Sequence, residues 1–81
     1  MSKLESYYKQ KRGHNSATLC LLFNKAIELD DMQVLFQAQA YADGLIDAYD
    51  AILDEEASTE IEDIVAEYTV SFVNRGKDGV N

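Results

Sequence analysis

The clearest pattern of apolar and polar positions lies between residues 31 and 55. Apolar residues recur there at alternating spacings of four and three, the period of an α-helix buried along one face. The members of this seam are Val34, Ala38, Tyr41, Leu45, Ala48 and Ile52. A second apolar line beside it consists of Ala42, Ile46, Tyr49 and Leu53. With Asp30 as the residue that starts it, the pattern predicts a central helix over 31–55, the longest of the fold, with apolar surface for two neighbours or for one neighbour and a partner chain.

Two shorter helices are predicted before the central one. Ser2 begins a capping-box pattern, which predicts a short basic helix over 1–13 that ends near Gly13. Its apolar content is thin, so we expect this helix to pack loosely. Ser16 then predicts the N-cap of a second helix, and the apolar run over 19–23 indicates that this helix is deeply buried.

The last part of the chain allows two interpretations. Thr59 and Glu62 form another capping-box pattern, and the helical spacing of apolar residues over 61–72 predicts a final helix. Alternatively, the β-branched and aromatic residues of 68–73 form a strand, which would make the fold α+β. We favour the helix because the apolar stripe requires it. The remaining residues, 75–81, are predicted to be a disordered tail.

Length and composition favour an all-α fold. The chain has 81 residues, 47% of them apolar, and it contains no proline. It shows no linker or repeat, so we expect one domain over 1–81, a small bundle of three to four helices. A core of this size is thin, and the surplus apolar surface of the central helix predicts a homodimer or a higher oligomer.

Charge is distributed unevenly along the chain. The net charge is −8, yet residues 1–25 carry five Lys or Arg and a single acidic residue. Residues 26–67 carry thirteen acidic residues and no Lys or Arg. Such an asymmetry bears on the partners of a protein rather than on its fold.

The acidic residues form a regular row in the predicted central helix. Asp43, Asp47, Asp50 and Asp54 follow one another at spacings of four, three and four, opposite the apolar seam. A solvated face that aids solubility is the simpler explanation, but like charges at this spacing destabilise a helix by a few tenths of a kcal/mol each. We therefore predict that this row and the acids after it bind a partner. The predicted partner-binding residues are Asp43, Asp47, Asp50, Asp54, Glu55, Glu56, Glu60, Glu62, Asp63 and Glu67.

Residues that carry catalytic chemistry are sparse. The single histidine, His14, lies in a polar segment, and the single cysteine, Cys20, lies in an apolar run, so neither forms a nucleophile–base pair. The triplet 43–45 is similar to the Asp-Ser-Leu motif of acyl carrier proteins, but Gly44 lacks the hydroxyl that holds their prosthetic group. We therefore expect a non-enzyme with no catalytic residue, no cofactor and no metal site.

A row of regularly spaced carboxylates is similar to a row of phosphates on a nucleic-acid strand. In size and acidity the chain resembles small phage-encoded DNA mimics that inhibit host proteins, which implies a phage or mobile-element origin. We expect it to inhibit a basic nucleic-acid-binding protein by occupying the site of DNA. The alternatives are another protein-binding inhibitor or adaptor, and a structural, oligomerising bundle.

The remaining expectations concern nucleic acid and location. The segment YYKQKRGH mixes aromatic and basic residues as single-strand binders do, but the acidic remainder would repel phosphates, so we expect no direct nucleic-acid binding. The basic segment instead steers a partner, closes onto the acidic face of its own chain, or pairs with another copy. The chain has neither a bilayer-length apolar run nor a signal-peptide pattern. We expect a cytoplasmic protein, in the host cytoplasm if it is viral, with no membrane contact.

Overall fold

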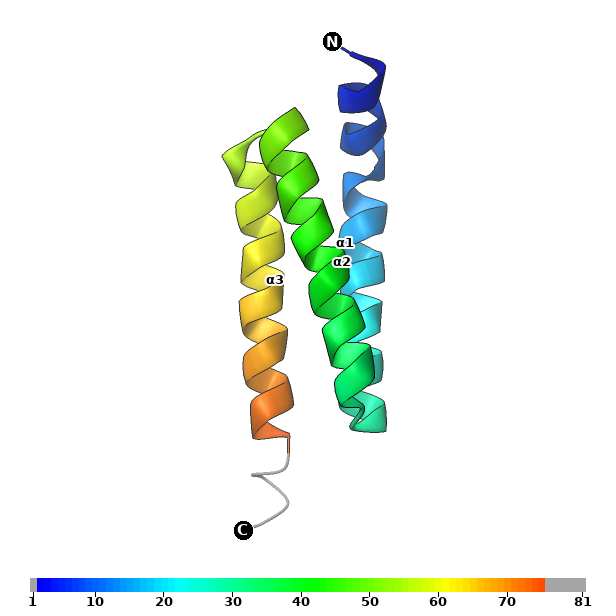
Figure 1. Cartoon of the computed structure of the whole chain (residues 1–81), viewed down its shortest axis with the longest axis vertical. Helices are drawn as coiled ribbons and strands as arrows, with labels where there is room; N and C mark the ends of the chain where they lie inside the picture. The colour runs from blue at the N-terminus through cyan, green and yellow to red at the C-terminus, as the bar shows by residue number, and fades with distance from the viewer. Residues whose placement is uncertain (1, 76–81) are drawn as a thin grey trace.

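The chain folds into an antiparallel bundle of helices. The computed structural model describes residues 2–75, over which it has three helices, α1 (Lys3–Leu29), α2 (Met32–Ile52) and α3 (Glu55–Asn74), and no strand. Figure 1 shows the N-terminus of α1 and the α2–α3 turn at one end of the bundle and the α1–α2 turn at the other. The all-α prediction is confirmed, and residues 68–73 are helical.

The two helices predicted before the central one form a single helix, α1. It begins at the predicted N-cap, Ser2, whose side chain accepts a hydrogen bond of 3.1 Å from the Glu5 backbone N–H. It then continues through Gly13 and Ser16, so the predicted end and the predicted second N-cap are both wrong. A glycine inside a helix costs only about 1 kcal/mol relative to alanine, and burial of the α1 residues Leu19 and Phe23 outweighs that cost. With 27 residues against 21 in α2, α1 is the longest helix, so the prediction that the central helix over 31–55 is the longest is wrong.

Aspartates shape both turns of the bundle. Asp30, at φ 53°, ends α1 in the left-handed conformation, which Asp tolerates better than most residues. Asp31 is the N-cap of α2, one residue later than predicted, and accepts from the Gln33 backbone N–H at 2.9 Å. Asp54 is the N-cap of α3 and accepts from the Ala57 N–H at 2.9 Å. The helix start predicted at Thr59 is therefore wrong, because α3 already begins at Glu55.

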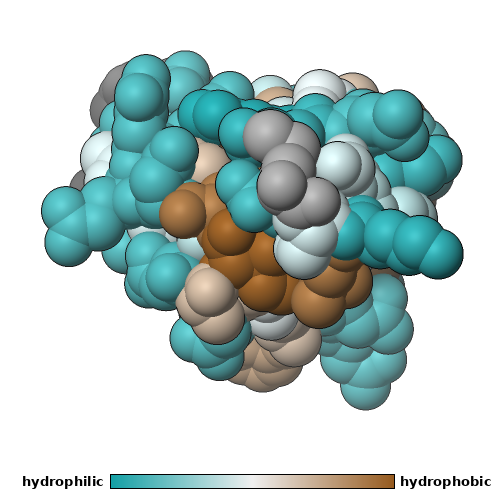
Figure 2. Space-filling view, turned by 90° about the horizontal axis from the view of Figure 1, so that it is seen from above, coloured by the Kyte–Doolittle hydropathy of each residue, from teal (hydrophilic) through white to brown (hydrophobic). Residues whose placement is uncertain are grey.

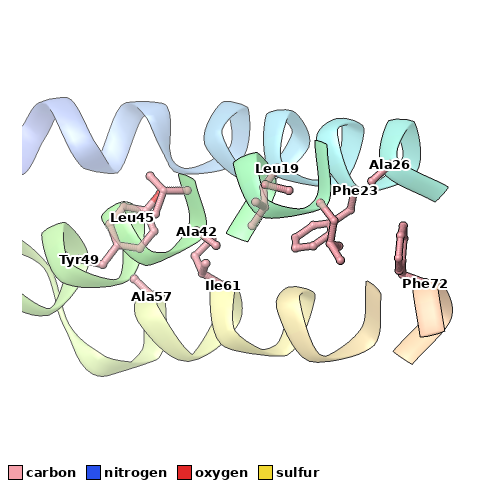
Figure 3. Close-up of a cluster of buried hydrophobic side chains, with 11 residues drawn as sticks. Leu19, Phe23, Ala26, Ala42, Leu45, Tyr49, Ala57, Ile61 and Phe72 are labelled. Atoms are coloured by element: carbon pink, nitrogen blue, oxygen red, sulfur yellow. The ribbon is translucent and has the colours of Figure 1, made fainter. Parts of the chain in front are cut away.

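The core is a single cluster of apolar side chains between α1, α2 and α3. Figure 3 shows them in the space that the helices enclose. Its buried members are Leu19, Phe23, Ala26, Leu35, Ala38, Ala42, Leu45, Tyr49, Ala57, Ile61 and Phe72. On α2 the buried residues alternate between the two predicted apolar lines, Ala38 and Leu45 from the first and Ala42 and Tyr49 from the second. The core face of α2 therefore runs between the lines, because α2 packs on both α1 and α3.

Polar contacts fix the register of α1 against α2. The Asn15 amide donates to the Tyr49 hydroxyl at 3.4 Å and accepts from the Tyr41 hydroxyl at 3.2 Å. Tyr49 is fully buried, so its hydroxyl needs such a partner. Burial is also the main reason that the pKa of Tyr41 lies above its ordinary value.

The two ends of the bundle differ. At the α1–α2 turn, Arg75 reaches Asp30, and its guanidinium lies 3.7 Å from the centroid of the Phe72 ring. Arg75, assigned to the tail from the sequence, thus makes defined contacts, whereas Met1 and residues 76–81 lie outside the described part. At the opposite end, Figure 2 shows apolar surface framed by hydrophilic atoms. Leu4, which is 53% exposed, lies in the first turn of α1 at that end.

Candidate partner-binding surface

The structure places the predicted acidic residues on two helices and the turn between them. All ten are exposed. Asp43, Asp47 and Asp50 lie on α2, whereas Asp54 follows its last residue, Ile52, and caps α3. The predicted row along one helix therefore contains three aspartates rather than four. The other acids, from Glu55 to Glu67, lie on α3.

The acids of α3 divide between two sides of that helix. Glu56, Glu60, Asp63 and Glu67 follow one another at spacings of four, three and four, and Glu60 contacts Arg12 of α1. We call these four residues the α1-side strip. Glu55 and Glu62 lie three residues before and four residues after Ser58, which contacts Asp50 of α2. They therefore share a surface with the aspartates of α2, and the α2-side strip consists of Asp43, Asp47, Asp50, Glu55 and Glu62.

The α1-side strip already holds a cation of its own chain. Two nitrogens of the Arg12 guanidinium lie 2.8 and 2.9 Å from one carboxylate oxygen of Glu60. This hydrogen bond is the largest cause that raises the pKa of Arg12 above its ordinary value. Arg12 and Glu60 line an open groove of about 660 Å³ together with Glu55, Glu56, Thr59 and Asp63. The basic segment of α1 thus closes onto part of the acidic surface.

Within residues 2–75, no cation pairs with the α2-side strip. Among the residues that the structure describes, the ion pairs are Glu5–Lys9, Arg12–Glu60 and Asp30–Arg75, and none includes a member of this strip. Asp50 does have a neutral partner, because the Ser58 hydroxyl donates to it at 2.6 Å. Asp43 and Asp47 remain one helical turn apart with their mutual repulsion uncompensated. Within the described residues, neither carboxylate forms an ion pair.

Sequence reasoning missed the apolar residues that continue the α2-side strip. Phe36, seven residues before Asp43, lies on the same face of α2 and is 59% exposed. Met32, one turn earlier, is 53% exposed. Phe36 belongs to neither predicted apolar line. The signal that could have identified it is its spacing of seven residues from Asp43, which places it on the same face as the aspartates. Exposed aromatic side chains are enriched at protein-binding surfaces.

Groups with catalytic or ligating chemistry are dispersed. His14 is exposed on α1, and Cys20 is half-buried beside Tyr68. Within residues 2–75, no three His, Cys, Asp or Glu side chains are placed so that they could share a metal ion. None of α1, α2 and α3 has an apolar stretch that would reach across a bilayer.

Comparisons with known proteins found no relative of this chain. No family model, no curated protein and no solved structure matches the chain. The function is therefore inferred from the chemistry of the surface itself.

Proposed function

We propose that this protein inhibits a basic nucleic-acid-binding protein by occupying the site of DNA with its α2-side strip. The observation that carries the proposal is the row Asp43, Asp47 and Asp50, which is exposed and has no cationic partner in the described part of the chain. At 1.5 Å of rise per residue, these carboxylates are about 5 Å apart along the helix. Phosphates of one DNA strand follow one another at about 3.4 Å.

The second row of the strip strengthens the resemblance to a duplex. Glu55 and Glu62 lie on α3, beside the aspartates of α2. Packed helices have axes about 8–10 Å apart, and the grooves of B-DNA are about 6–12 Å wide. Lys and Arg side chains that grip phosphates across a groove would therefore meet carboxylates at a similar separation. The proposed role is non-catalytic and its setting is the cytoplasm, that of the host if the gene is viral.

Capture experiments with matched variants test this proposal. The immobilised protein should retain a basic protein that added duplex DNA displaces. Asp43→Asn with Asp47→Asn should abolish this retention, whereas the control Asp63→Asn with Glu67→Gln, which removes two charges from the α1-side strip, should preserve most of it. Retention should also fall as salt rises, because exposed charges are screened over about 8–10 Å at physiological ionic strength. A partner that binds the Asn variant unchanged, or that holds DNA and this protein together at one site, would contradict the proposal.

A structural, self-associating role is the second candidate. The observation that favours it is the exposure of large apolar side chains outside the core, with Leu21 at 65% and Phe36 at 59%. A monomer gains nothing from leaving these side chains in water. Self-association and partner binding are compatible functions of one chain, and they involve overlapping surfaces.

A further inference from the structure

One exposed face of α1 carries basic residues along nearly its whole length. Its members follow one another at spacings of four, four, three, seven and four, which keeps them on one side of the helix. This basic stripe consists of Lys3, Tyr7, Lys11, His14, Leu21 and Lys25. Tyr7 is 53% exposed and Leu21 is 65% exposed, so the stripe combines cations with apolar surface. Glu5 lies outside it and pairs with Lys9, whereas Glu28, three residues after Lys25, lies on the same face at the end of the stripe.

An exposed face of α2 carries the opposite charge. Met32, Phe36, Asp43, Asp47 and Asp50 follow one another at spacings of four, seven, four and three, and all are exposed. This acidic stripe has a charged half and an apolar half, whereas the basic stripe has cations at both ends. The charged half lies toward the α2–α3 turn, and the apolar half lies toward the α1–α2 turn.

Contacts between α1 and α2 fix the heights of the two stripes along the bundle axis. Asn15 contacts Tyr41 and Tyr49, which lie on either side of Leu45, so residue 15 of α1 is level with residue 45 of α2. Because α1 and α2 are antiparallel, a residue four positions before Asn15 is level with the residue four positions after Leu45. Lys11 is therefore level with Tyr49, next to Asp50. By the same count, Lys25 is level with Leu35, next to Phe36. Lys11 is therefore level with the acidic residues of α2, Leu21 lies within one turn of the level of Phe36, and Lys25 lies level with the apolar residues of α2.

The stripes lie on either side of the outward surface of α2. Lys11 precedes Asn15 by one turn, and Asn15 contacts α2, so the basic stripe follows the α2 side of α1. Asp50 contacts Ser58, so the acidic stripe follows the α3 side of α2. A second copy can be related to the first by a two-fold axis that runs parallel to the helices, outside the exposed surface of α2. The acidic stripe of each copy then lies on the same side as the basic stripe of the other, and each residue keeps its height along the bundle. Figure 1 shows α2 crossing in front of the lower part of α1.

We propose that a second copy of this chain binds there, with the basic stripe of each copy on the acidic stripe of the other. The two-fold symmetry forms each contact twice, as closed dimers do. It brings Lys11 of one copy to Asp47 and Asp50 of the other, and Leu21 to Phe36. An antiparallel dimer would set other residues opposite Lys11 and is not the arrangement proposed. The dimer does not depend on the nucleic-acid-binding partner proposed above.

Charge exchange between two variants tests this contact. One variant carries Lys11→Glu, so that acid faces acid in its own dimer. The other carries Asp47→Lys, so that base faces base. In a mixture of the two, both pairs of stripes are again complementary. Sedimentation equilibrium should show a wild-type dimer whose dissociation constant rises with salt, an increase in that constant on the order of tenfold for each variant alone, and a dimer in the mixture.

Each alternative result would overturn the proposal. A wild-type monomer at high micromolar concentration excludes the dimer, and variants that still dimerise alone locate the contact on another surface. A mixture that remains monomeric shows that the stripes do not pair. Far-UV circular dichroism establishes that each variant is folded, and Leu21→Ser provides a further test that changes no charge. Because Leu21 lies outside the core, this variant should retain its helicity and lose dimer affinity.

Discussion

The Ser58 hydroxyl near the start of α3 donates a hydrogen bond to the Asp50 carboxylate near the end of α2, with 2.6 Å between the oxygens. Ser58 is 4% exposed, and Asp50 is exposed. One member of the acidic row therefore holds the α2–α3 corner together, while Asp43 and Asp47 make no comparable contact within the described residues. The aspartates look alike in the sequence but make different contacts.

The first prediction separates these aspartates by their stability effects. Asp50→Ala should lower the free energy of unfolding by about 1 kcal/mol, because the Ser58 hydroxyl loses a charged acceptor. It retains a neutral one, since the Glu55 carbonyl oxygen lies 3.0 Å away. Asp43→Asn and Asp47→Asn should leave stability unchanged or raise it by a few tenths of a kcal/mol, because repulsion is relieved. Urea unfolding measures all three, and equal effects at Asp43 and Asp50 would show that the corner contact adds nothing.

The second prediction concerns the start of α3. Asp54→Ala should cost about 1 kcal/mol, because the Ala57 N–H loses its capping acceptor, whereas Asp54→Asn should retain most of the stability. Thr59→Ala is the matched control, since Thr59 is an exposed residue inside α3 and should have little effect. The opposite order, with Thr59 costly and Asp54 neutral, would place the helix start where the sequence pattern suggested.

Local signals in the sequence predicted the presence of the helices more accurately than the residues at which they begin and end. The capping box at Thr59 was a convincing pattern, yet Asp54 caps α3 because the chain has to turn directly after the core residue Tyr49. Ser16 was a similar case, since the packing of α1 along α2 keeps the helix unbroken. Capping patterns mark positions where a helix can start, and tertiary packing decides which of them is used.

The third prediction tests the continuity of α1. A Cβ added to Gly13 would meet no atom within 4 Å, so Gly13→Ala should raise the free energy of unfolding by roughly 0.5–1 kcal/mol. Ser16→Ala should also stabilise, because the buried Ser16 hydroxyl has no hydrogen-bond partner. If Ser16 instead began a separate helix, its replacement would cost about 1 kcal/mol. Thermal unfolding of the two variants distinguishes these outcomes by sign.

The acidic surface was partly predictable. The positions of Asp43 and Asp47 on an exposed face followed from helical periodicity alone. The pairing of Glu60 with Arg12 did not, because 48 residues separate them and only the packing of α1 near α3 brings them together. Phe36 was overlooked because it breaks both apolar lines, although that departure is what marks it as an exposed side chain.

The fourth prediction is a loss of stability at alkaline pH. Burial raises the pKa values of Tyr41 and Tyr68 above their ordinary value of 10.0 in the folded protein. The folded state therefore keeps these protons at a pH where the unfolded chain has lost them, so the contribution is complete below pH 10 and falls as pH rises through the folded-state pKa values. Urea unfolding at pH values on both sides of 10 should show this decline. Tyr41→Phe should lower stability at neutral pH, through loss of the Asn15 contact, and should weaken the alkaline decline.

The last prediction links the two proposed contacts, because the acidic row of α2 belongs to both. A basic partner bound to Asp43 and Asp47 would exclude the basic stripe of a second copy, so partner binding should dissociate the dimer. The Lys11→Glu variant keeps these acids and loses the competing cation. It should capture the same DNA-displaceable protein as the wild type, with higher apparent affinity at concentrations where the wild type is dimeric. A weaker capture would show that Lys11 contacts the partner itself, and equal capture with the dimer still intact would place the two contacts on separate surfaces.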